Sequence, residues 1–158
     1  KTEDYDFKIL SSKNYDFRQI DNFSSSKHKY GFGRSSKFLN WRVSKNPIHY
    51  YTILEIIKDE ELHGLIIFKE YQGSIDIMEI FYKNINNNED ILKASIYNLA
   101  NNSKGIYIWS NLFSDEHILL ESLGFQETSF NTYFGYISKD FQLNNKKVHF
   151  RFLDSDVY

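Results

Sequence analysis

The feature that most constrains the fold is a series of three β-rich runs joined by very short turns. The runs cover Tyr50–Ile57, Glu61–Tyr71 and Ser74–Tyr82, and the turns KDEE and QG fall between them. Turns this short join antiparallel neighbours, because a parallel connection needs about a dozen residues or more. We therefore expect an antiparallel meander at the centre of the protein.

The segment after this meander predicts a strand that runs parallel to the last of the three. A helix is expected over Glu89–Asn101, followed by the short apolar strand Gly105–Ser110. The buried face of this helix is formed by residues at helical spacing, Leu92, Ser95, Ile96 and Leu99. A helix that connects two strands of one sheet usually makes them parallel neighbours.

The rest of the chain completes a mixed α+β pattern. Further strands are expected at Tyr5–Leu10, Thr128–Ser138 and Lys147–Leu153, and helices within Ser12–Asp21, Ser35–Pro47 and Ser114–Leu123. The fold class is therefore α+β, with a mixed sheet of about seven strands flanked by about four helices. With 158 residues and no internal repeat, the chain fits a single domain spanning 1–158.

Composition excludes several classes of function. The net charge of −2 gives no overall attraction to nucleic acid or to an anionic membrane. The chain has no cysteine, and its five histidines show no His-x-x-x-His spacing, so we expect no metal site. No apolar run approaches the roughly 20 residues that cross a bilayer, so we expect a cytoplasmic protein without a membrane span. Because the sequence starts at Lys1, we expect it to be part of a longer chain.

Four short motifs occur along the chain. They are FLNWRVSKNP (Phe38–Pro47), YY (Tyr50 and Tyr51), ESLGF (Glu121–Phe125) and FLDSDVY (Phe152–Tyr158). Together with the order of helices and strands, they resemble the GNAT superfamily of acyltransferases. The likeness is closest to the acetyltransferase-like domains of bacterial surface-polysaccharide gene clusters, where this unit is often the C-terminal half of a longer chain.

The resemblance implies that acetyl-CoA binds where the two parallel strands separate. The pantetheine arm would pair with the main chain of Ile77–Phe81. The pyrophosphate would lie at the loop after Tyr82, because free N–H groups at the start of the next helix attract anions. The implied cofactor-binding residues are Ile77, Met78, Ile80, Phe81, Lys83, Asn86, Asn87, Asn88 and Asn111.

The phosphate loop departs from the family pattern. The family usually has Gln or Arg followed by two glycines, whereas this chain has KNINNN at 83–88 and then Glu89 and Asp90. Asparagine tolerates a left-handed φ, so the turn stays possible. The two acids already complement the helix dipole and would repel a phosphate. A functional variant and a weakened cofactor site are therefore both open.

One carboxylate is a candidate general base. Glu79 interrupts the apolar residues of its strand, and a buried carboxylate there could accept a proton from an attacking amine. Asp76 is the weaker alternative. In the structural interpretation, Glu79 faces solvent or pairs with Arg42.

The family's usual general acid is missing from its position. The resemblance implies a tyrosine four residues before Gly124, but Leu120 occupies that position. Tyr107, Tyr97 or Tyr133 would have to replace it, and Tyr107 is taken as the candidate.

The acceptor side is implied by the helix that carries Trp41 and Arg42, followed by Tyr51. Arg42 could bind a carboxylate or phosphate with two parallel hydrogen bonds, and Trp41 could stack on a sugar. The structural interpretation is a core tryptophan beside an arginine that holds Asp154 or Asp156. The loop GFGR at 31–34 lacks the rest of a dinucleotide-binding motif and is expected to be a plain loop.

Two functions follow from these expectations. The first is an acetyl-CoA-dependent N-acetyltransferase that acts on an amine, such as an amino sugar or a polysaccharide precursor. The second is a GNAT-like domain that has lost catalysis and serves a structural or acceptor-binding role beside an active domain. The expected partners are a small-molecule or sugar acceptor and either a domain of the same chain or a second copy, with no nucleic acid.

Overall fold

The computed structural model describes residues 4–23, 33–84, 86, 88–129 and 149–155. Their centre is a five-stranded sheet with the strand order β1-β2-β3-β4-β5. The strands are β1 (Asp6–Ser11), β2 (Thr52–Lys58), β3 (Glu61–Tyr71), β4 (Ser74–Tyr82) and β5 (Ile106–Ile108). The first four strands pair antiparallel, and β4 pairs parallel with β5, so the predicted meander and the predicted parallel pair are both confirmed.

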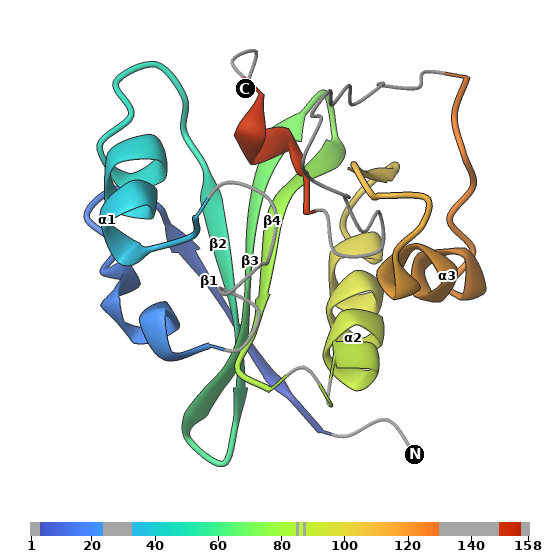
Figure 1. Ribbon diagram of the computed structural model, residues 1–158, viewed down its shortest axis with the longest axis horizontal. Coiled ribbons are helices and arrows are strands. Elements are labelled where there is room, and N and C mark those ends of the chain that lie inside the picture. The colour runs from blue at the N-terminus through green and yellow to red at the C-terminus, as the bar shows by residue number, and fades with distance from the viewer. Residues whose placement is uncertain (1–3, 24–32, 85, 87, 130–148, 156–158) are drawn as a thin grey trace, which may run out of the picture.

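Helices cover both faces of this sheet, as Figure 1 shows. One face carries the 3-10 helix η1 (Phe17–Asn22) and the helix α1 (Ser36–Leu39), which continues as the π-helical turn η3 (Asn40–Ser44). The other face carries α2 (Asn88–Ala100) and α3 (Asp115–Ser122). A 3-10 turn, η6 (Phe152–Asp154), lies near β4. The described fold is therefore a mixed α+β domain with one parallel strand pair.

The sheet separates two apolar cores, because successive strand residues point to opposite faces. The core towards α2 includes Leu54, Ile56, Ile66, Ile75, Ile77, Ile80, Ile91 and Leu92. The core towards α1 includes Phe17, Ile20, Leu39, Val43, Ile53, Ile67, Met78 and Phe81. Both faces of β3 and β4 are covered, so Leu65–Phe68 of β3 and Ile77–Tyr82 of β4 are buried at every position.

A β-bulge interrupts β4 in its middle. Ile67 of β3 pairs with Glu79 and Phe68 pairs with Ile77, so Met78 has no opposite residue. The extra residue shifts the alternation, because Ile77 and Ile80 then lie in the same core although they are three positions apart. The bulge therefore accounts for the polar residue Glu79 within an apolar strand.

Two sequence predictions need correction in the described part of the chain. The sheet has five strands there rather than about seven. The predicted strand Thr128–Ser138 lies outside the described residues from 130 onwards, and the predicted strand Lys147–Leu153 is described from 149. Its described part contains the turn η6, because the Asp154 carboxylate accepts the Arg151 N–H at 2.9 Å and curls the backbone.

The first predicted helix is also shorter and later than expected. It is η1, and it is capped by the carboxylate of Asp16. Ser12 is fully buried instead, where its hydroxyl accepts the Tyr51 N–H at 3.2 Å and ties the end of β1 to the start of β2.

Candidate functional site

The most distinctive feature of the protein is a cluster of charged side chains buried beside the bulge of β4. We call it the ionic cluster; its members are Arg34, Glu79, Glu116, His149, Arg151 and Asp154. They come from the start of α1, from β4, from α3 and from the segment that contains η6. Burying charges is costly unless they are paired, and the described contacts pair every member of the cluster.

Glu79 lies at the centre of the ionic cluster and is fully buried. Its carboxylate accepts from the Arg34 guanidinium, and both of its oxygens lie 3.0 Å from Nε2 of His149. Its Oε1 also accepts the N–H of Ile80 at 3.0 Å. Both oxygens of this carboxylate therefore have hydrogen-bond partners within the protein.

The same contacts determine the charge state of Glu79. Burial by itself would raise the pKa of this carboxyl, but the charges of His149, Arg34 and Arg151 outweigh burial and hold the pKa well below its usual range. A carboxylate with a lowered pKa is a weak base near neutral pH, since it has little tendency to accept a proton. The general-base role of Glu79 stays a prediction that these contacts disfavour.

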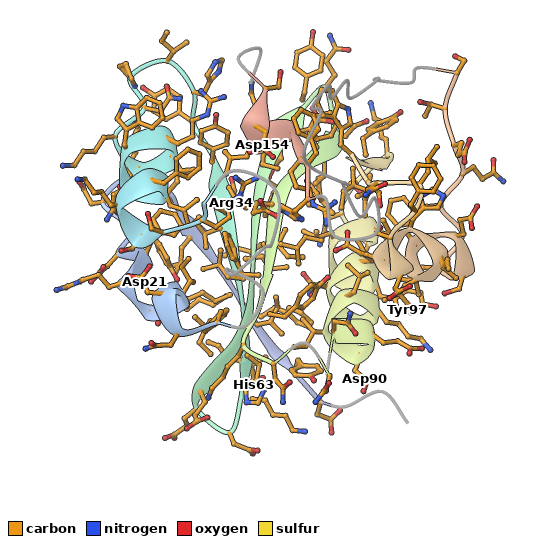
Figure 2. The ribbon with its side chains drawn as sticks, viewed as in Figure 1. Asp21, Arg34, His63, Asp90, Tyr97 and Asp154 are labelled. Carbon is orange, nitrogen blue, oxygen red and sulfur yellow. The ribbon has the colours of Figure 1, made fainter. Side chains whose placement is uncertain are left out.

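Arg34, which lies just before α1, links β4 to the turn η6. Its guanidinium is fully buried and contacts Asp154 at 2.7 Å in addition to Glu79. Figure 2 shows Arg34 and Asp154 pointing towards each other between α1 and η6. Arg34 is thus the residue that holds the acid of the terminal DSD motif, a role that the sequence assigned to Arg42.

Arg151 lies beside β4, just beyond the end of its ladder with β5. The ladder between these strands has three residue pairs, and it ends at Ile77 and Ile108. Beyond that end, Nε of Arg151 lies 3.6 Å from Glu79 on β4, and its NH1 donates to the carbonyl of Trp109, which follows β5, at 2.7 Å. Its NH2 donates to Glu116 on α3.

Aromatic packing fixes the segment that carries Arg151. The Trp109 ring stacks on Phe150 at 5.6 Å between centroids and contacts Phe152 at 4.6 Å. Arg151 itself is only 3% exposed. A buried arginine therefore joins β4, the residue that follows β5 and α3.

The predicted pantetheine-binding residues on β4 are part of the cores. Ile77, Met78, Ile80 and Phe81 are all buried. The described part of β4 after Ile77 has no strand paired with it on the β5 side. Because β5 ends at its last paired residue, the expected separation of the two strands stays a prediction. One N–H group of this part of β4, that of Ile80, already donates to Glu79.

Polar groups of the predicted phosphate loop have ion-pair or hydrogen-bond partners within the protein. Lys83 pairs with Glu61 at 2.6 Å, and the side chain of Asn84 accepts the N–H of Asn86 at 3.0 Å. Asn88 begins α2, whose first turn contains Glu89 and Asp90. Asn87 lies outside the described residues. The cation of Lys83 and the N–H of Asn86, two groups that a pyrophosphate would use, thus have protein partners here.

The remaining candidates near β5 are separate from the ionic cluster. Tyr107 is 48% exposed on β5, opposite Asp76 of β4. Burial raises the pKa of Asp76, although the charge of Lys69 opposes this effect. Asn111 serves the turn before α3, because its side chain accepts the N–H of Phe113 at 3.0 Å. The general-acid role of Tyr107 stays a prediction, and Leu120 is buried.

The acceptor-side residues behave differently from one another. Trp41 is 67% exposed, so the interpretation as a core residue is wrong. Arg42 donates to the main-chain carbonyls of Leu153, at 3.3 Å, and Ser155, and Asp154 pairs with Arg34. Asp156 lies outside the described residues. Tyr51 is buried, and its hydroxyl has no hydrogen-bond partner among the described residues.

Sequence reasoning missed four members of the ionic cluster as site residues. Arg34 was expected in a plain loop, and no role was predicted for Glu116, His149 or Arg151. Their signal would have been the number of charges that flank apolar segments, as in HFRFLD at 149–154. Such a pattern indicates burial of charge without indicating which acid meets which base.

The described helices and two comparisons with known proteins give the following results. Among the described helices, none has the length and apolar character that a membrane crossing requires. A scan against protein-family models gives no match, and a search of curated proteins gives no match either.

Proposed function

We propose that this chain is a GNAT-like domain that binds a sugar or polysaccharide acceptor without transferring an acyl group itself. The observation that carries this proposal is the position of Arg151, which bridges Glu79, the Trp109 carbonyl and Glu116 where the acyl donor would lie. A pantetheine arm would have to displace this buried guanidinium, and Glu116 would then lose its partner.

The loop after β4 supports the same conclusion. It lacks glycine, Lys83 is paired with Glu61, and two acids occupy the first turn of α2. Among the described residues of this loop, the one cation that a pyrophosphate could use, Lys83, therefore already has an acidic partner.

The acceptor-binding part of the proposal rests on aromatic side chains at the α1–β2 connection. Trp41 is 67% exposed and Tyr50 is 69% exposed. The flat face of an exposed aromatic side chain suits the C–H face of a sugar ring. The backbone beneath them is held, because Asn46 donates to the Arg42 carbonyl and accepts from Ile48 and His49.

The expected result of removing Trp41 is loss of sugar binding without loss of the fold. Trp41→Ala should weaken binding of an amino-sugar or hexosamine oligosaccharide at least about tenfold, since one well-placed aromatic contact contributes more than 1 kcal/mol. The measurement is a calorimetric titration with a panel of such sugars. The matched control is Tyr97→Ala, an aromatic that is 58% exposed on α2. Equal affinity in the wild type and the Trp41 variant would exclude this surface.

A second candidate function is the acyltransferase of the resembled family. One observation favours it: β5 ends after three residue pairs, so among the described residues the main chain of β4 beyond Ile77 has no strand partner on that side and could pair with a pantetheine arm. In that case Arg151 has to leave before the donor enters. His149 would then be a better-placed base than Glu79, because Glu79 orients its imidazole. Binding of acetyl-CoA separates the two candidates.

A further inference from the structure

Helix α3 ends in a turn that brings the chain back along the helix. Gly124 has φ +94, a left-handed conformation that glycine adopts without strain. Its N–H donates to the Glu121 carbonyl at 2.9 Å, and the Phe125 N–H donates to the Leu120 carbonyl at 3.1 Å. This pair of bonds is a Schellman ending, and it directs the following residues towards the helix face that precedes them.

Three side chains with metal-binding chemistry meet at this turn. His117 and Glu121 are four residues apart on α3 and therefore share a face. Nε2 of His117 lies 3.7 Å from Oε1 of Glu121 and 3.7 Å from Oε1 of Glu127, which follows the turn. One donor atom from each of the three residues lies within 4.8 Å of the other two. A small side-chain movement would place all three around one ion.

The charge of this group is unbalanced. Within the described residues, neither Glu121 nor Glu127 has a lysine or arginine partner. The histidine ring is mostly covered, with 15% of its side chain exposed, whereas the two carboxylates are more than half exposed. The group therefore combines a held imidazole with two carboxylates that can adjust to a ligand.

The donor set selects a class of ion. Imidazole and carboxylate together suit first-row divalent transition metals such as Zn²⁺, whereas Ca²⁺ and Mg²⁺ prefer oxygen ligands alone. Bonds of about 2.0–2.2 Å would set the donor atoms roughly 3.0–3.6 Å apart, slightly closer than they are here. Three protein ligands leave at least one coordination position for water or another ligand.

We propose that His117, Glu121 and Glu127 form a binding site for a divalent transition metal ion at the end of α3. The ion would join the helix to the segment after Gly124. The site is independent of the acceptor surface at Trp41, and its occupancy does not depend on the proposed function. The absence of a His-x-x-x-His spacing did not exclude such a site, because the spacing used here is His-x-x-x-Glu with a second glutamate supplied by the turn.

The test is a calorimetric titration of ZnCl₂ into protein that has been stripped of metal with a chelator. The expected result is saturable binding of one ion. His117→Asn, Glu121→Gln and Glu127→Gln should each weaken this binding by more than about tenfold. The matched controls are His63→Asn and Glu70→Gln, which change the same residue types on β3. A second readout is the thermal unfolding midpoint, which Zn²⁺ should raise in the wild type and in the controls but not in the three variants.

Two results would overturn the metal site. One is the absence of binding heat at millimolar ZnCl₂. The other is an unchanged affinity in the His117, Glu121 and Glu127 variants, which would assign the binding to other residues. Either result would identify the three side chains as a surface charge group without a metal, and the unfolding readout shows that a variant is folded before its affinity is compared.

Discussion

Glu79→Gln is expected to destabilise the protein by about 3–5 kcal/mol, which is the usual cost of breaking a buried ion pair by removing one partner. The amide keeps the size of the side chain but leaves Arg34, His149 and Arg151 facing a neutral group. All three lie in surroundings where water cannot replace the lost charge. The free energy of unfolding in urea, measured by circular dichroism, gives the effect directly.

The control for this variant is the same substitution at an exposed position of the sheet. Glu61 pairs with Lys83, but both side chains are largely exposed, so Glu61→Gln should cause little measurable change. A Glu79→Gln protein as stable as Glu61→Gln would mean that the ionic cluster does not hold β4, α1 and η6 together.

Arg151→Ala is the second substitution with a large expected effect. It removes the guanidinium that joins Glu79, the Trp109 carbonyl and Glu116. We expect a loss of about 3–5 kcal/mol in the free energy of unfolding, because Glu116 becomes a mostly buried carboxylate without its partner. Denaturant unfolding followed by tryptophan fluorescence reports it, since Trp109 lies at the site.

A matched control exists for this variant too. Arg18 pairs with Asp16 on the surface, so Arg18→Ala should unfold at the wild-type denaturant concentration. The double variant Glu116→Gln with Arg151→Ala should lose less stability than the sum of the single variants, because the orphaned carboxylate is gone. A fully additive double variant would contradict the direct Arg151–Glu116 pairing.

The regular part of the fold could be predicted from the sequence because its causes are local. The turns between the β2, β3 and β4 runs are too short for anything other than antiparallel pairing. Ser114 marks the start of α3 as its N-cap, and Gly124 marks its end as the residue with a left-handed conformation. Periodicity and turn chemistry act over a few residues, so one sequence is enough to read them.

The ionic cluster could not be predicted because its pairs are distant in sequence. Arg34 meets Glu79 over 45 residues and Asp154 over 120 residues. A charged side chain carries no periodic signal that identifies its partner. Arg42 of the WR motif was the natural choice for the acid of DSD, but Asp154 pairs with Arg34, and Arg42 donates to the carbonyls of Leu153 and Ser155.

Trp41 illustrates the other limit of sequence reasoning. Its size favours burial, yet Leu39 and Val43 occupy the buried face of this helical segment. Trp41 lies between them in sequence, about half a turn away from each, and so projects to the outside. The feature that makes it a candidate binding residue, its exposure, appears only when the helix is packed on the sheet.

We propose that Arg151 and its partners occupy the place beside β4 that an acyl donor would take. The most direct measurement is a calorimetric titration of acetyl-CoA into the wild-type protein, with release of the CoA thiol monitored in the presence of amino sugars. We expect that the wild-type protein shows no saturable binding at millimolar acetyl-CoA and no thiol release. Saturable one-to-one binding accompanied by thiol release that depends on an amine would contradict it, and would establish the acyltransferase function instead.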